Sequence, residues 1–399
     1  MHTSQSIHAG IPFTFVVFRG MLAAASLVSA STLTWIVSKT QPDMSIRVTI
    51  QMVAGLLALL LAGLAASIVK RRGGPTLVAI LVAAAIPLPW FMSWLVTHPQ
   101  ISAYALLGYG LAVALIDAFA VPAQEALQNH LFSRASHARA TKTTGVQVRS
   151  GTQFVARILL WASLATGAIG INGVGAARAT FLTEMSLLCS FLVVTLLLRR
   201  IKQIDTTQSA INTATSEKRS LAPIFWLEFC LNGFFLGALM LPKTLPTSDL
   251  STMNWVLALG GLGSLLGTIS ARVSPTFLWM IIVADLVTAS VTFSQTSTAA
   301  IAVGWFFMSF CYGAFDTVFA RAVQAGHYQQ TAEQASFRRL LMNGLRPFTM
   351  FLIIKAQALL GIGDREIVFW SLGLTVAILI PFAVIQWNRI NETIADARG

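Results

Sequence analysis

The chain has 399 residues, enough for two or three soluble domains, but 55% of them are hydrophobic and only 11% are charged. Soluble domains carry about 25% charged residues, so a chain of this composition stays solvated only if most of its surface faces lipid. The net charge of +12 does not indicate a nucleic-acid binder, because the basic residues occur in short runs between apolar stretches. The composition therefore predicts an integral membrane protein.

Twelve apolar segments of membrane-spanning length follow one another along the chain, and they predict an all-α membrane protein. One crossing takes about 20 mostly apolar residues. The first segment is expected to be retained rather than cleaved, because Met1 to Gly10 has no Lys or Arg and the apolar run exceeds a signal peptide's. The predicted spans are 11–37, 47–69, 75–97, 101–127, 146–170, 176–198, 221–241, 251–271, 276–295, 299–322, 339–361 and 366–388.

The one long polar connection, 199–220, divides six spans from six. It has basic clusters at both ends and a middle rich in Ser, Thr and Gln. We expect an N-terminal six-helix bundle over 1–198, a cytoplasmic loop over 199–220 and a C-terminal six-helix bundle over 221–399. With both termini placed in the cytoplasm, the inner connections hold sixteen Lys and Arg and the outer ones five, which is the asymmetry that membrane insertion favours.

A weak internal repeat relates the two halves. Ala118-Phe119, followed by Ala126 and Gln128, matches Ala314-Phe315, followed by Ala322 and Gln324, with identical spacing. The match joins the fourth predicted span to the tenth, where two six-helix repeats would place it. Repeated halves are typical of secondary transporters.

Twelve spans with a basic central loop resemble the major facilitator superfamily, and so does the connection after the second span. That family's loop pattern is Gly, three residues, Asp, Arg or Lys, one residue, Gly, Arg, then Arg or Lys. The chain keeps Gly63 and the final basic pair, Arg71 and Arg72, and has Ser67 in place of the Asp. The resemblance implies two pseudo-symmetric six-helix bundles, the major facilitator fold.

A closer resemblance covers 119–157, which is similar to the secretion-effector branch that contains bacterial siderophore exporters. It rests on Pro122-Ala123, Ala126-Leu127 and Ala138-Arg139-Ala140. The Gly-Pro element usual in the fifth span of exporters of this superfamily is replaced around Arg157. The resemblance implies a bacterial inner-membrane transporter, acting as a monomer, that exports a siderophore-like molecule by exchange with protons.

Twelve ionisable residues fall inside the predicted spans, where each costs at least about 2.5 to 3.5 kcal/mol unless it faces a cavity or a partner. The resembled fold lines its central cavity with spans one, four, seven and ten, and here these carry Arg19, Asp117, Glu228 and Asp316. The charged residues are the acids Asp117, Glu125, Glu184, Glu228, Asp285 and Asp316 and the bases Arg19, Arg149, Arg157, Arg321, Arg346 and Lys355.

The inner-span charges have two interpretations, and the sequence leaves both open. They form either a substrate or proton site, or an inner gate of salt bridges. In the first, Arg19, Arg157, Glu228 and Arg346 bind substrate. Asp117 and Asp316 carry the coupling proton or lock the gate. Glu184 and Asp285, on helices expected to be peripheral, are expected to be structural.

The excess of bases over acids near the expected cavity favours an anionic substrate, because Arg binds carboxylates through two parallel hydrogen bonds. An importer of an anionic metabolite or siderophore, a multidrug exporter and a sensor with a degenerate transporter fold are the alternatives. Glycines 260, 261, 263 and 267 have a spacing typical of helix packing. No metalloprotease motif, nucleophile elbow or P-loop occurs, so we expect neither an enzyme nor a cofactor or metal site.

Overall fold

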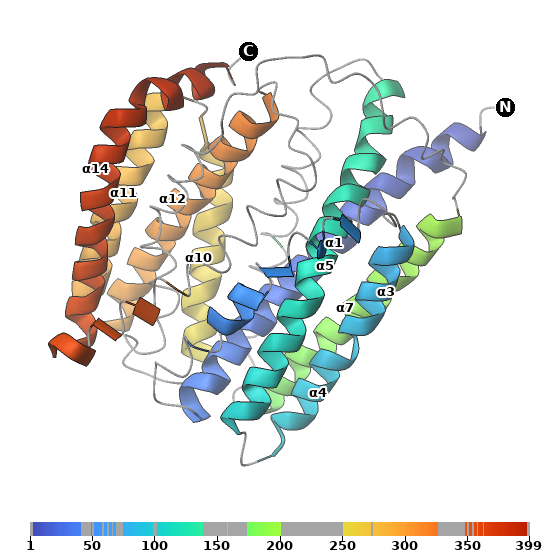
Figure 1. Ribbon diagram of the computed structural model, residues 1–399, viewed down its shortest axis with the longest axis horizontal. Coiled ribbons are helices and arrows are strands. Elements are labelled where there is room, and N and C mark those ends of the chain that lie inside the picture. Colours follow the sequence, from blue (N-terminus) through green and yellow to red (C-terminus); the bar gives the residue numbers. More distant parts are fainter. Residues whose placement is uncertain are drawn as a thin grey trace.

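The computed structural model describes most of nine helices, and every regular element among its described residues is helical (Figure 1). The described residues are 3–40, 75–98, 102–138, 174–200, 250–272, 274–325 and 363–396, with short pieces at 49, 52–57, 60–61, 64–65, 67–68, 158, 348, 351–352, 355–356 and 358–361. The helices are α1 (Thr3–Thr40), α3 (Pro75–Ala85), α4 (Pro87–Leu95), α5 (Ala103–Ala138), α7 (Val174–Arg200), α10 (Leu250–Ser270), α11 (Pro275–Ser294), α12 (Thr298–Ala325) and α14 (Asp364–Asp396).

Within these residues six spans are long and apolar enough to cross a membrane, or seven if a bent pair in α14 counts as one. The protein is therefore a multi-pass membrane protein, as the composition predicts. The predicted spans 146–170, 221–241 and 339–361 lie wholly or mostly outside the described residues, and so does the loop segment 201–220, whereas 47–69 is described only in short pieces.

A serine side chain caps the N-terminus of three of the described helices. The Ser274 hydroxyl accepts a hydrogen bond from the Phe277 backbone N–H at 3.1 Å, and Pro275 occupies the first turn of α11. Ser102 and Ser297 cap α5 and α12 in the same way. A capping serine satisfies a backbone donor that has no partner inside the helix, which fixes where each of these spans starts.

Prolines shape two of the predicted spans. The third span is two helices, α3 and α4, that meet at Ile86 because Pro87 has no N–H to continue the ladder. α14 contains Pro381, and its segments Leu372–Ile378 and Ile380–Glu392 are bent by 49°. Both α5 and α14 continue beyond the predicted ends of their spans, at 127 and 388, into polar sequence.

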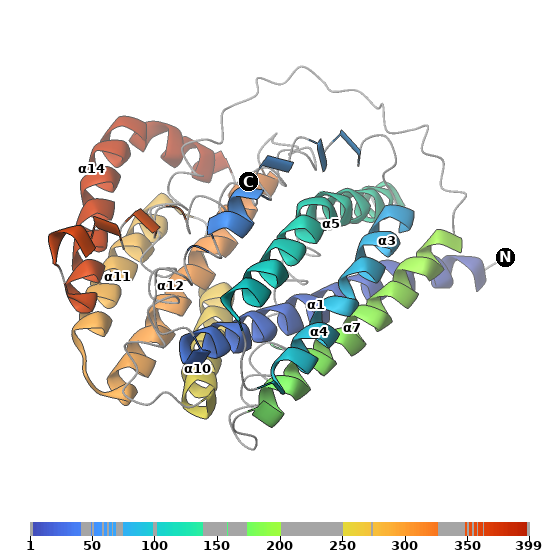
Figure 2. The same cartoon turned by 60° about the horizontal axis from the view of Figure 1, so that its bottom comes forward.

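The helices form two groups, which Figures 1 and 2 show side by side. The N-terminal group contains α1, α3, α4, α5 and α7, with α7 packed on α1, α3 and α4. The C-terminal group contains α10, α11, α12 and α14, with α12 packed on both α10 and α11. Both chain termini lie at the same end of the structure, the upper end in Figure 1.

α10 and α12 approach so closely that their backbones touch. A Cβ atom added at Gly263 would overlap the Phe306 carbonyl oxygen, and one at Gly267 would overlap that of Phe310. From the other side, a Cβ at Gly313 would overlap the Ser264 carbonyl. The packing role predicted for the glycines of α10 is confirmed. Small residues allow membrane helices to gain the dispersion contacts that hold them together in lipid.

Three buried apolar clusters show how the two groups are joined. The junction cluster lies at the end away from the termini and includes α7 of the N-terminal group together with all four C-terminal helices: Ala176, Met253, Val256, Ala289, Phe293, Ile301, Ala302, Trp305, Met308 and Leu372. Towards the termini each group has its own cluster. The N-terminal cluster is Phe15, Leu22, Val78, Val82, Ala123, Leu127, Leu188, Phe191 and Leu198. The C-terminal cluster is Leu278, Ile281, Ile282, Cys311, Ala314, Phe315, Val318, Phe319 and Ile390.

The alanines of the predicted repeat, Ala118 in α5 and Ala314 in α12, are both fully buried, and each lies in the inner part of a long helix. Ala118 belongs to a small cluster with Ala114, and Ala314 belongs to the C-terminal cluster. The pairing of the fourth and tenth spans stays a prediction.

Candidate functional site

The structure describes three of the six residues predicted to bind substrate or move protons. Arg19 on α1 and Asp316 on α12 are half-buried, and Asp117 on α5 is exposed. The remaining predicted site residues and the loop-motif residues lie outside the described residues: Arg157, Glu228 and Arg346, and Gly63, Arg71 and Arg72.

A polar cluster lies inside the N-terminal group, among otherwise apolar helices. The Ser26 hydroxyl of α1 donates a hydrogen bond to Glu184 Oε1 of α7 at 3.4 Å. Ser29, one turn further along α1, is buried on the same face. Glu184 therefore has a partner on another helix, and its second oxygen, Oε2, is buried without a hydrogen-bond partner among the described residues.

α5 contributes to the same region. Tyr109 is buried and lies close enough to Glu184 and Asp117 to interact with both electrostatically. Asp117 and Glu184 also interact with each other. Asp117 of α5 and Glu184 of α7 therefore lie in the same region as the Ser26 hydroxyl of α1.

Arg19 lies on the face of α1 that looks into the N-terminal group. Helical spacing places it beside Phe15 and Leu22, two members of the N-terminal cluster, and two turns from Ser26. Arg19 places a cation on this face of α1, and the Ser26 hydroxyl lies about 10 Å further along the helix axis, at 1.5 Å of rise per residue.

In the C-terminal group, Asp316 lies one turn after Tyr312 on the same face of α12, and both are half-buried. Asp316 is also one turn after Gly313, which meets α10, whereas Phe315 and Val318 belong to the cluster that α12 shares with α11. Asp316 therefore lies towards the α10 side of α12 rather than the α11 side.

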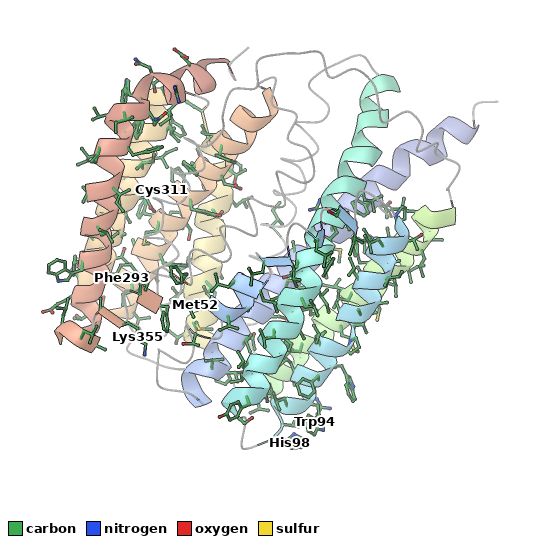
Figure 3. The ribbon with its side chains drawn as sticks, viewed as in Figure 1. Met52, Trp94, His98, Phe293, Cys311 and Lys355 are labelled. Atoms are coloured by element: carbon green, nitrogen blue, oxygen red, sulfur yellow. The ribbon has the colours of Figure 1, made fainter. Side chains whose placement is uncertain are left out.

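Lys355, one of the six bases assigned to the expected cavity, is exposed, and its Nζ lies 5.5 Å from the centroid of the Phe351 ring. Phe351 packs against the junction cluster, so this cation belongs to the end away from the termini. Figure 3 shows Lys355 in the lower part of the C-terminal group, well below Cys311.

Sequence reasoning missed the polar cluster. Ser26 and Ser29 are separated by one helical turn in an apolar span, and this spacing is the signal that would have indicated a polar face on α1. Tyr109 gave no signal, because a single tyrosine in a span is as typical of packing as of a site. Among the described residues no group of three His, Cys, Asp or Glu side chains is arranged to hold a metal ion.

No protein-family model matches the sequence, and no curated protein matches it. Solved structures do match. A point mutant of the nucleoside transporter NupG aligns with a TM-score of 0.66 and 12% identity, over 94% of this chain and 99% of that one. A bacterial homologue of the human lysosomal transporter Spinster, in an inward-facing and unoccupied conformation, aligns with a TM-score of 0.60 and 13% identity, over 98% and 97%.

The same Spinster homologue in its inward-facing and occupied conformation aligns with a TM-score of 0.54 and 14% identity. These neighbours are transporters rather than enzymes, and they have the major facilitator fold. Identities this low establish the fold alone. The chain is therefore an all-α membrane protein with the major facilitator fold.

Proposed function

We propose that the protein is a secondary transporter that moves a small, anionic, carboxylate-bearing molecule of siderophore type across the bacterial inner membrane by alternating access. Transport is export coupled to protons, carried out by a monomer with both termini in the cytoplasm. The observation that carries the proposal is the way the two helix groups meet. At the end away from the termini Ala176 of α7 joins a buried cluster of the C-terminal group, whereas towards the termini each group has its own cluster.

This arrangement is what a carrier open towards its termini needs. Among the described residues the two groups have separate buried clusters towards the termini. In a carrier, contacts between the bundles at one end and separation at the other expose a central path to one side only. The rocking of two such bundles about a site near the middle of the membrane is the general mechanism of carriers with repeated halves. The two bundles of the proposal are 1–198 and 221–399, joined by the loop 199–220.

The substrate class follows from the charges. Arg19 is a half-buried cation on α1. Arg157 and Arg346 are proposed to complete the anion site with it, and Glu228 is proposed to orient the bound substrate. Asp117 and Asp316 are proposed to carry the coupling proton. The electrostatic contact of Asp117 with Glu184 supports its part, because a proton taken up there relieves repulsion between two acids.

The test is flux in proteoliposomes under an imposed pH gradient, with carboxylate siderophores, hydrophobic cationic drugs and nucleosides as probes. We expect accumulation of the carboxylates on the side opposite the termini. Arg19→Gln should reduce carboxylate transport about 10- to 100-fold, since a charge-assisted hydrogen bond contributes about 1.5 to 3 kcal/mol. Arg178→Gln, at an exposed arginine of α7, is the matched control and should transport normally.

Three results would contradict the proposal in separate ways. Normal carboxylate flux in the Arg19→Gln protein would show that Arg19 does not bind the substrate. A preference for cationic drugs or nucleosides would show that the substrate is not an anion. Absence of saturable flux for every probe favours a sensor built on a transporter fold.

The coupling assignment has its own test. If Asp117 or Asp316 carries the proton, its Asn variant should still exchange substrate between equal concentrations but lose accumulation driven by the pH gradient. If both acids only lock a gate, accumulation should persist in both variants while the resting conformation shifts.

A further inference from the structure

Asp285 occupies the middle of the packed face of α11. The face runs through Leu278, Ile281, Ile282, Asp285, Ala289 and Thr292, all buried. Asp285 is only 1% exposed, and it is the eleventh of the 20 residues of a span that crosses the membrane. It lies between the C-terminal cluster, to which Leu278, Ile281 and Ile282 belong, and the junction cluster, to which Ala289 belongs.

Neither oxygen of the Asp285 carboxyl has a hydrogen-bond partner among the residues that the structure describes. The thiol of Cys311 on α12 is close enough to interact with the carboxyl electrostatically. Figure 3 shows Cys311 within the C-terminal group, in the region where α11 and α12 pack. On α14 another buried acceptor, Gln386 Oε1, also has no partner among the described residues.

The other titratable groups on the packed helices lie at different levels or on different faces. α10 carries no titratable side chain, and α12 carries Tyr312, Asp316 and Arg321 besides Cys311. On α14 the nearest charged residues, Arg389 and Glu392, flank Asn391, which accepts a hydrogen bond from Trp279. Trp279 is six residues before Asp285, or about 9 Å along the helix. Asp364, Arg365, Glu366 and Asp396 are residues at the two ends of α14.

An ionised carboxylate at this position is strongly disfavoured. The site is in the middle of a span, its surroundings are apolar, and a buried charge is tolerated only when it is paired and hydrogen-bonded. A metal cation would need six or so oxygen ligands, and the described residues hold no such group. A proton needs one oxygen and removes the charge, so it is the ligand that this geometry fits.

We propose that Asp285 is a proton-binding site of the C-terminal group, which holds its proton while α11 and α12 are packed and exchanges it with solvent only when that interface opens. Opening lets water solvate the carboxylate, the proton leaves to water, and reclosing requires that a proton be taken up again. This site is distinct from the coupling residues proposed above, and it does not depend on the identity or direction of the substrate. A purely structural role for Asp285, which the sequence predicts, does not explain why neither carboxyl oxygen has a hydrogen-bond partner among the described residues.

The first experiment is infrared spectroscopy of the full-length protein in nanodiscs, with the carboxyl carbon of aspartate isotopically labelled. We expect a carbonyl stretch of protonated aspartate at neutral pH, loss of part or all of that band in Asp285→Asn, and an unchanged band in the control variant Asp364→Asn, at the first residue of α14. A band that is unchanged in Asp285→Asn overturns the proposal. If that variant does not fold, the wild-type spectrum still decides, because the absence of a protonated aspartate at neutral pH also overturns it.

The second experiment uses Cys311 as a reporter of opening, in a protein carrying Cys189→Ser and Cys230→Ser. The rate of alkylation by a small, membrane-permeant reagent should rise with pH, because the thiolate is the reactive form. Ionisation of the thiol alone raises the alkylation rate at most tenfold per pH unit. If Asp285 must also lose a proton before the open state accumulates, two deprotonations are needed, and the alkylation rate of the wild type rises up to a hundredfold per pH unit. In Asp285→Asn the rise stays tenfold. Equal pH profiles in the two proteins overturn the proposal.

Discussion

Gly267→Ala is expected to weaken the pairing of α10 and α12 directly. The added Cβ atom would meet the carbonyl oxygen of Phe310 and the backbone nitrogen of Ala314. Backbone atoms of a helix cannot rotate aside as a side chain can, so the two helices must separate. Because α12 also packs on α11, the displacement is transmitted through the whole C-terminal group.

The size of the effect follows from two opposing contributions. Overpacking a well-packed interior costs about 1 to 3 kcal/mol, and the upper part of that range applies where the obstacle is backbone. Replacing Gly by Ala inside a helix returns about 0.5 to 1 kcal/mol. We therefore expect Gly267→Ala to lower the free energy of unfolding by about 2 kcal/mol, a change of more than tenfold in the unfolding equilibrium.

Gly373→Ala supplies the matched control, since a Cβ at Gly373 of α14 meets nothing within 4 Å. This control should gain about 0.5 to 1 kcal/mol from helix propensity. The assay is equilibrium unfolding in mixed micelles of increasing SDS fraction, followed by circular dichroism. Equal stability of the two variants would refute the inference that backbone contact sets the spacing of α10 and α12.

Three further substitutions test other features of the structure. Ser26→Ala should destabilise the protein by about 1 kcal/mol in the same assay, because it leaves Glu184 without its donor, whereas Ser186→Ala, at an exposed serine of α7, should have no measurable effect. Gly361→Ala should cost about 1 kcal/mol, since the residue has φ of 66°, and a neutral result would show that this turn relaxes freely. Pro381→Ala should lower the thermal midpoint by straightening α14; an unchanged or higher midpoint would show that the bend is incidental.

The spans were predictable because lipid imposes a length and a composition on any helix that crosses it. The ends of the helices were less predictable. α5 continues eleven residues past its predicted end at 127, since hydropathy marks the edge of the membrane and not the end of the hydrogen-bond ladder. The break between α3 and α4 was readable in principle, because Pro87 lies in the middle of the predicted third span.

The partners of the buried acids were not predictable from sequence. Ser26 and Glu184 are 158 residues apart, and only the packing of α7 on α1 brings them together. The same composition would have allowed Asp285 to face a serine or an arginine of another helix. Which face of a span meets which neighbour depends on helix rotation, and a uniformly apolar helix such as α11 carries little information about its own rotation.

The junction cluster consists only of apolar side chains, and this has a thermodynamic consequence for any cycle that separates the two groups at that end. Exposing the apolar surface that Ala176 of α7 shares with this cluster to water adds a positive heat-capacity change to opening, as hydration of apolar surface does in unfolding. The closed form should then be favoured by a free energy that curves with temperature and weakens on cooling. Ionic strength should alter it little, whereas a junction held by ion pairs would respond to salt and show a nearly straight temperature dependence.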